Sequence, residues 1–291
     1  MPEGFKEVTH ASWLGRIGGA LKGILVGLVL FLVAFPLLFW NEGRAVRRHQ
    51  TLEEGGGAVV SVPADRVDAG NEGKLVHLTG TAVTDATLSD AAFGVSARGV
   101  RLKRTVEMYQ WQERARSTTS KQVGGGTETT TTYTYTKTWS ATLLSSADFK
   151  KPQGHRNPEA MPYDSVEYTA EHVRLGAFTL SPSLVRKIDN FTSLPVPGDA
   201  PLPEALRGKG TVHDGGFYLG GDPTSPQVGD VRVRFTVVRP GEVSLIARQA
   251  RDTFEPYATK AGGTIELLQP GVHTAEAMIR HEQESNVILT W

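Results

Sequence analysis

Residues 17–40 read IGGALKGILVGLVLFLVAFPLLFW, and this stretch decides how the chain is organised. A helix that crosses a bilayer needs about 20 mostly apolar residues, and Lys22 is the only charge here. The uncharged part, Ile24–Trp40, holds thirteen Ile, Leu, Val and Phe residues, which contribute about −4 to −8 kcal/mol to membrane insertion. Trp13 and the Phe39–Trp40 pair bracket the stretch as interfacial aromatic residues do. The sequence therefore predicts a transmembrane helix over 17–40.

Glycines recur at every fourth position in this region, at Gly15, Gly19, Gly23 and Gly27. On one helix they form a nearly continuous stripe, and small residues allow two helices in lipid to approach closely. Two interpretations stay open: glycine is simply commoner in membrane helices, or the stripe is a helix–helix contact. Because we predict a single span, the contact partner comes from another chain. We expect a homo-oligomer through the transmembrane helix, or assembly with other membrane proteins.

Polar residues follow the apolar stretch directly, at Asn41, Glu42 and Arg44. We expect these three residues at the membrane interface together with Trp13, Phe39 and Trp40. There Glu42 and Arg44 meet lipid headgroups or pair locally; the alternative is a generic polar stop. A cleaved signal peptide would have a shorter apolar core, usually 7–15 residues, and small residues before its cleavage site. Three basic residues precede the core and three follow it, so the positive-inside rule does not fix the orientation.

The composition of the rest of the chain excludes several classes of protein. The formal net charge is zero and the isoelectric point is near neutral, so nothing favours the binding of nucleic acid. There is no cysteine, which excludes disulfides, thiolate zinc sites and a cysteine nucleophile. Residues from about 50 onwards are numerous enough to bury a core of their own, or even two small cores.

Alternating patterns predict mainly strands. A strand is expected at 74–83, and a long β-hairpin pairs 100–116 with 127–144 around a mobile glycine tip at 124–126. A second hairpin is expected between 230–238 and 243–249, with its turn at Pro240–Gly241.

Helices are expected at three further places. One starts with Ser181 as N-cap and Pro182 at the first helical position, and runs to about Asn190. One turn is expected at 204–207, after a short loop, and a helix at 274–286 follows a last strand at 264–268.

These patterns predict an α+β fold: a mostly β extramembrane domain with long β-hairpins, tethered by an N-terminal transmembrane helix. The expected parts are an N-terminal segment (1–16), the transmembrane helix (17–40), a juxtamembrane linker (41–57), a β-rich extracytoplasmic domain (58–270) and a C-terminal helix (271–291). That last helix becomes apolar toward its end. Two interpretations stay open: this helix leads toward a further membrane span, or it packs on the domain with a frayed end.

The sequence contains few candidates for catalytic or metal-binding residues. No histidine has the partner spacing of a helical metal site, and we expect no catalytic residue, cofactor or metal. His213 and Asp214 precede two glycines and form the strongest candidate for a cleft, while Glu171–His172 is interpreted as a surface pair. Arg101, Lys103 and Arg104 are interpreted as the solvated edge of a strand.

Several segments resemble the transmembrane protein 43 (LUMA) family. They are FPLLFWNEGRAV at 35–46, VEMYQW at 106–111, GH at 154–155, NPEAMP at 157–162, LGAF at 175–178 and GDVRV at 229–233. The resemblance implies a multi-span membrane protein with one large domain between its first span and a C-terminal cluster of spans. It also implies self-assembly and membrane organisation at the endoplasmic reticulum and nuclear envelope, and offers no catalytic residues. The Ala-, Gly- and Arg-rich composition favours a bacterial member with a periplasmic domain on the inner membrane.

Two functions remain open at this point. We favour an integral membrane scaffold that self-associates and organises membrane or partner proteins without catalysis. The alternative is a membrane-anchored ligand-binding or enzymatic domain, which requires a concave pocket with converging polar groups near His213 and Asp214.

Overall fold

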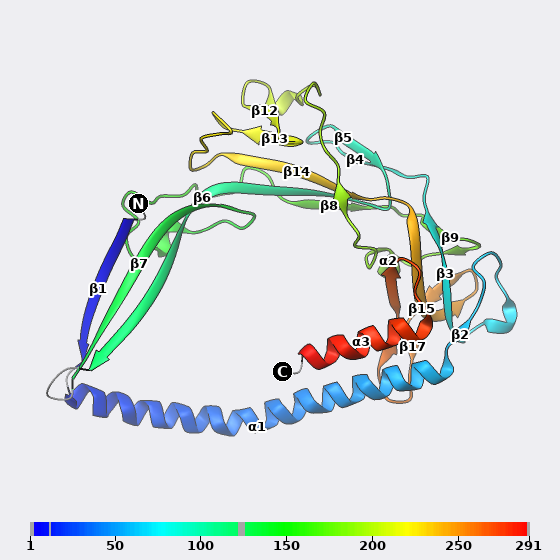
Figure 1. The fold of residues 1–291 in the computed structure, drawn as a ribbon, viewed down its shortest axis with the longest axis horizontal. Coiled ribbons are helices and arrows are strands. Elements are labelled where there is room, and N and C mark those ends of the chain that lie inside the picture. The colour runs from blue at the N-terminus through cyan, green and yellow to red at the C-terminus, as the bar shows by residue number, and fades with distance from the viewer. Residues whose placement is uncertain (1–2, 12, 122–125, 290–291) are drawn as a thin grey trace. The chain divides into compact units, whose positions relative to one another are not determined.

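Strands are the commonest regular structure of the described residues, as predicted (Figure 1). The computed structural model describes residues 3–11, 13–121 and 126–289. These residues pack as two compact units. Unit 1 is formed by 1–36, 105–165 and 196–234, and unit 2 by 37–104, 166–195 and 235–291.

Helix α1 (Trp13–Ala58) contains the predicted span and continues far beyond it. Pro36 lies inside this helix without ending it. The predicted linker at 41–57 is helical because its far end packs on unit 2. Leu52 is fully buried, and a Cβ added to Gly55 would collide with Ile265. This packing outweighs the cost of about 1 kcal/mol that each glycine brings to a helix.

The long β-hairpin of unit 1 is confirmed. Strand β6 (Arg101–Lys121) pairs antiparallel with β7 (Thr127–Ser140), and the register runs from Met108 opposite Ser140 to Lys121 opposite Thr127. The mobile glycine tip was predicted at 124–126, and residues 124 and 125 lie outside the described ranges.

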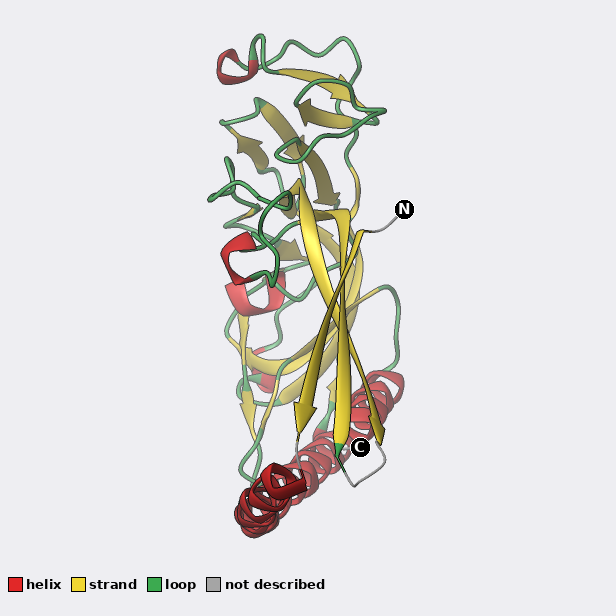
Figure 2. Cartoon of the chain, turned by 90° about the vertical axis from the view of Figure 1, so that its left-hand side faces the viewer, coloured by secondary structure: helices red, strands yellow, loops and turns green. Residues whose placement is uncertain are grey.

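A strand that is not predicted, β1 (Glu3–Ala11), lies on the other edge of β7. Nine residue pairs join the two strands, from Glu3 opposite Tyr135 to Ala11 opposite Thr127. Figure 2 shows β1, β7 and β6 as long strands lying side by side. The segment EGFKEVTHA carries little apolar alternation of its own, so its strand conformation depends on β7.

Unit 2 is built around the pair β3 (Leu75–Val83) and β15 (Gly241–Ala250), with Gly241 opposite Ala82 and Arg248 opposite Leu75. The predicted strand at 74–83 is thereby confirmed. Strand order in this sheet is β10-β9-β3-β15-β16, with β19 also on β15 and β2 on β3. Its core is formed by apolar side chains that include Val76, Leu78, Val173, Phe178, Leu184, Leu245 and Phe254.

The prediction of a second hairpin is wrong. Strand β14 (Val231–Val238) pairs with β13 (Gly216–Leu219), whereas β15 belongs to the sheet of β3. Pro240 lies between β14 and β15 and has no N–H to give to a ladder between them. Because β15 is buried along most of its length, it needs a sheet partner, and β3 supplies eight register pairs.

The predicted helices are found with different bounds. Helix α2 (Pro182–Val185) follows Ser181 as expected but ends before Asn190. It stops because the carbonyl oxygens of Arg186 and Ile188 accept hydrogen bonds from Arg101 instead of from a further helical turn. A 3₁₀ turn lies at Glu204–Leu206, and α3 spans Ala275–Leu289.

The remaining strands are short. They are β2 (Val60–Ser61), β4 (Thr87–Asp90), β5 (Val95–Arg98), β8 (Val166–Thr169), β9 (Arg174–Leu175), β10 (Phe178–Thr179), β11 (Thr192–Ser193), β12 (Gly210–His213), β16 (Thr253–Glu255), β17 (Tyr257–Ala258), β18 (Thr264–Ile265) and β19 (Leu267–Pro270). The single strand predicted at 264–268 is therefore two strands, β18 and β19, which pair with β17 and β15.

Candidate functional site

The apolar part of α1 has no protein cover. Large apolar side chains between Ile24 and Trp40 are 45–81% exposed, and none of the apolar window of this helix is buried. Within the described residues, α1 is the one helix long and apolar enough to cross a membrane. Water does not tolerate so large an apolar surface, so lipid or other apolar helices surround it.

The described part of the glycine stripe faces open space. A Cβ added at Gly23 or Gly27 would meet no atom within 4 Å, so this face is free to receive another helix. Gly15 and Gly19 lie in the same helix, but their surroundings, and the side chain of Trp13, fall outside what the structure describes. Within the described residues, no atom of this chain fills the space beside Gly23 and Gly27.

The predicted interface residues occupy the helix after the apolar stretch. Phe39 and Trp40 are the most exposed of its apolar side chains, at 81% and 73%. Arg44 donates a hydrogen bond to Asn41 Oδ1 at 3.3 Å, and Glu42 is exposed. Glu42 and Arg44 do not face one another because residues two apart on a helix point in different directions.

The far end of α1 is fixed to unit 2. Arg48 forms an ion pair with Glu282 of α3 at 2.9 Å and donates to the Thr264 carbonyl oxygen at 3.1 Å. Leu52 joins Met278 and Ile279 of α3 in a small apolar core. The end of α1 is therefore part of the packed core of unit 2.

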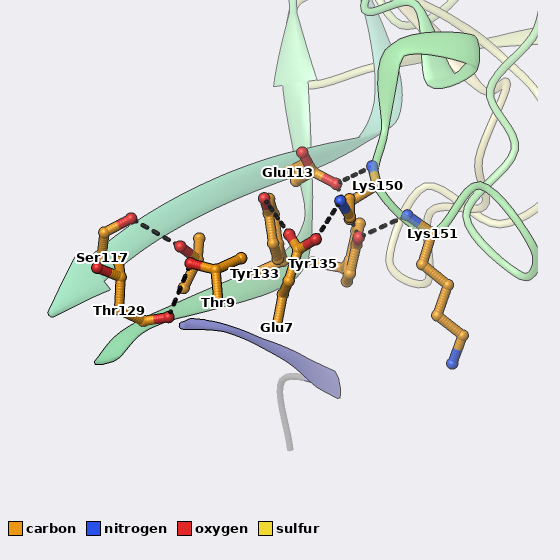
Figure 3. Close-up of polar contacts among 10 residues, drawn as sticks. Glu7, Thr9, Glu113, Ser117, Thr129, Tyr133, Tyr135, Lys150 and Lys151 are labelled. Carbon is orange, nitrogen blue, oxygen red and sulfur yellow. Dashed lines mark hydrogen bonds and ion pairs between the residues drawn. The ribbon is translucent and has the colours of Figure 1, made fainter. Parts of the chain in front are cut away.

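A polar network joins β1, β7 and the loop after β7 in unit 1 (Figure 3). Lys150 donates to Glu7 Oε1 at 2.7 Å, and Tyr133 donates to Glu7 Oε2 at 3.2 Å. The hydrogen bond from Lys150 lowers the pKa of Glu7, and the same bond raises the pKa of Lys150. Glu7 thus joins β1 by charge to the loop that follows β7.

Beside it, Tyr135 ties the two hairpin strands to the same loop. Its hydroxyl donates to Glu113 Oε2 at 2.7 Å and accepts from the Lys151 backbone N–H at 3.0 Å (Figure 3). Burial, followed by the bond to Glu113, raises the pKa of Tyr135 to about 12. This tyrosine stays a neutral donor at physiological pH.

The loop segment 151–162, which carries family-like motifs, acts as a clamp on the hairpin. Asn157 accepts from the Trp111 N–H at 2.7 Å and donates to the carbonyl oxygens of Trp111 and Leu144, both at 2.9 Å. The His155 ring stacks on Tyr135 with centroids 3.9 Å apart and meets the Trp111 ring edge-on at 4.7 Å. Through these contacts the motif residues hold the loop against the hairpin.

The predicted cleft at His213 and Asp214 exists but is small. A hollow of about 180 Å³ is lined by both residues and by Tyr218, Arg232 and Arg234. Arg234 is paired with Asp214 at 2.6 Å, and Tyr218 donates to Asp230. Ligand pockets usually measure about 300–1,000 Å³. No group of three potential metal-ligating residues occurs in the described ranges.

The interpretation of Arg101 and Arg104 as a solvated edge is wrong. Arg104 is 7% exposed and pairs with the fully buried Asp90 at 2.9 and 2.7 Å. Arg101 pairs with Glu167 and is also buried. Alternation alone shows which side chains share a face, and does not show that an acidic partner from another strand covers that face.

This architecture defines a class: a membrane-anchored protein whose apolar helix leads into a β-rich extramembrane domain. A family model for Transmembrane protein 43 matches residues 108–291. The chain is 40% identical to Transmembrane protein 43 of Rattus norvegicus over 96% of this chain and 72% of the relative, and 37% identical to that of Homo sapiens over 98% and 73%. A Transmembrane protein 43 homolog of Drosophila melanogaster is 30% identical over 92% and 71%.

The chain therefore belongs to the Transmembrane protein 43 family, as the sequence motifs predict. No solved structure matches it significantly. The relatives named here are all animal proteins, and nothing in them supports the expected bacterial source.

Proposed function

We propose that this protein is an integral membrane scaffold that self-associates and carries no catalytic chemistry of its own. The observation that supports this function most directly is the open glycine face on a fully exposed apolar helix. In lipid, helices associate through close packing of small residues, since burial of apolar surface gives no advantage there. The proposed contact is therefore between α1 of one copy and α1 of another.

The packing of the end of α1 on unit 2 supports the same proposal. Because the end of α1 is part of the core of unit 2 through Leu52 and Gly55, we expect an association of α1 helices to bring two copies of unit 2 near one another.

Substitutions in the stripe test the proposal. Gly19→Leu and Gly23→Leu fill the contact face, and Gly18→Leu makes the same change at a position about 140° from Gly23 around the helix. In mild detergent, mass measurement should show an assembly that shrinks with Gly19→Leu and Gly23→Leu and persists with Gly18→Leu. A monomer before and after substitution, or an equal effect of Gly18→Leu, would refute the scaffold.

A ligand-binding domain remains the second candidate because unit 2 has a larger hollow. It measures about 510 Å³ and is lined by residues that include Thr84, Asp85, Leu88 and His172, a volume within the usual range for ligands. Native mass spectrometry of the protein released gently from detergent tests this function. A small molecule retained by the wild type and lost when Leu88→Arg fills the hollow would favour it over the scaffold.

The side of the membrane is also a proposal. We place the β domain on the extracytoplasmic side: the periplasm in a bacterium, or the lumen of the endoplasmic reticulum or nuclear envelope in a eukaryote. Protease added to sealed vesicles of known orientation tests this placement. The domain should stay intact in vesicles whose cytoplasmic face is outward, and should be cut in vesicles whose extracytoplasmic face is outward.

A further inference from the structure

A strand pairing in unit 1 conflicts with a bilayer-spanning α1. If the apolar part of α1 crosses the membrane, residues before Trp13 lie on one side, and the residues after Ala58 lie on the other. Strand β1 is Glu3–Ala11, directly before this helix, yet it pairs along nine residues with β7 of the β domain. In the inserted protein, β1 and β7 are therefore on opposite sides of the bilayer.

The hairpin of β6 and β7 cannot enter the bilayer to remain paired with β1. Its strands carry charged side chains on both arms, including Glu113, Arg114, Arg116, Lys121 and Glu128. Charged residues are costly in hydrocarbon, and an open sheet edge cannot satisfy its backbone groups there. Pairing of β1 with β7 and spanning by α1 are thus two alternative arrangements of the same chain.

Insertion of α1 into the bilayer uncovers the edge of β7, which is well suited to pairing with another strand. The stretch of β7 that β1 covers, Thr127–Tyr135, reads TETTTTYTY. It has high β propensity, a single charge and no proline, and an edge of this kind readily accepts another strand. By contrast, the opposite arm at 113–121 carries four charged residues, the usual protection of an edge against pairing.

We propose that, once α1 spans the bilayer, the β7 edge pairs antiparallel with the same edge of a second copy. A two-fold axis at Thr131 keeps the whole uncovered stretch in register, so that Thr127 faces Tyr135 of the second copy and Thr129 faces Tyr133. Such a contact is isologous, as in most dimers. The lone acidic residue, Glu128, faces Thr134, so no like charges are opposed.

This contact adds an extramembrane interface to the self-association proposed above, and it uses no residue of the glycine stripe. It rests on insertion of α1 rather than on helix packing. The two contacts can therefore fail separately.

The absence of cysteine from the chain allows a direct test by disulfide trapping in intact membranes. Thr131→Cys places a thiol at the proposed two-fold axis, and Thr118→Cys is a control on the charged arm. A third variant, Thr9→Cys with Thr129→Cys, joins two residues that are opposite one another when β1 covers β7. Mild oxidant should convert Thr131→Cys to a species of twice the chain mass, and leave Thr118→Cys at the mass of one chain and the Thr9–Thr129 pair uncrosslinked.

Other outcomes overturn the inference. They are a monomeric Thr131→Cys, equal crosslinking of Thr118→Cys, attachment of Thr131→Cys to a different protein, or an internal Thr9–Thr129 disulfide in membranes. As a second measurement, copies with Thr129→Cys should crosslink to copies with Tyr133→Cys. Adding Gly23→Leu to Thr131→Cys separates the two contacts: the disulfide should persist even where the helix contact is lost.

Discussion

Removal of the Asp90 carboxylate should destabilise unit 2 strongly. Asp90, at the end of β4, has no exposed side-chain surface, and Arg104 on β6 is 7% exposed. Both carboxylate oxygens accept from Arg104, and one also accepts from the Phe93 N–H at 3.1 Å. Asp90→Ala therefore leaves a buried guanidinium without its carboxylate.

The size of the effect follows from this burial. Breaking a buried ion pair by removing one partner costs about 3–5 kcal/mol, because the other charge stays desolvated. We expect Asp90→Ala to lower the free energy of unfolding by about 4 kcal/mol, a large share of the roughly 5–15 kcal/mol typical of a domain. The exposed pair Arg98–Asp85, with side chains 65% and 87% exposed, should contribute less than about 1 kcal/mol.

Equilibrium urea unfolding in detergent, followed by circular dichroism, measures these differences, with Arg98→Ala as the matched control. The double variant Asp90→Leu with Arg104→Met should recover most of the loss, since apolar replacement of both partners removes the desolvation cost. A loss for Asp90→Ala within about 1 kcal/mol of that for Arg98→Ala would show that this pair is not desolvated as the structure indicates.

Three further changes have expected outcomes. Gly55→Val should lower the free energy of unfolding by about 1–3 kcal/mol through overpacking, whereas Gly57→Ala, which has open space, should raise it by about 0.5–1 kcal/mol; thermal midpoints that move in the same direction would contradict this. Asn157→Ala should lower the free energy of unfolding by about 3 kcal/mol, because it removes three hydrogen bonds. An unchanged urea midpoint would show that Asn157 does not stabilise the contact between the loop and the hairpin. The raised pKa of Tyr135 means that the stability from its burial and its bond to Glu113 is complete below about pH 10 and is lost as pH rises through about 12. Tyr135→Phe should remove one late step from the ultraviolet phenolate titration, and a titration identical to that of the wild type would contradict the assignment.

Several elements of this protein can be predicted from neighbouring residues alone. The apolar run of α1 is recognisable because a bilayer imposes a minimum length and composition on any helix that crosses it. The Thr- and Tyr-rich alternation of β7 and the Ser181–Pro182 start of α2 depend on neighbouring residues alone. The glycine stripe is also recognisable from the sequence, because a spacing of four residues places the glycines on one face of a helix.

Other features depend on residues far apart in the chain. The β1 strand takes its conformation from β7, more than 100 positions away, and β15 pairs with β3 rather than with its neighbour β14. The buried state of Arg104 depends on Asp90. Gly55–Gly57 is helical because Ile265 and Ile279 pack against it, although glycine locally favours a flexible linker.

The sequence by itself determined the membrane anchor, the β-rich domain and the family, since hydrophobicity, alternation and motif identity are properties of short segments. Only the tertiary structure decided which strands pair, which charges are buried and which edge of the hairpin is covered. Those outcomes are set by contacts between distant segments, whose free energies no local pattern contains.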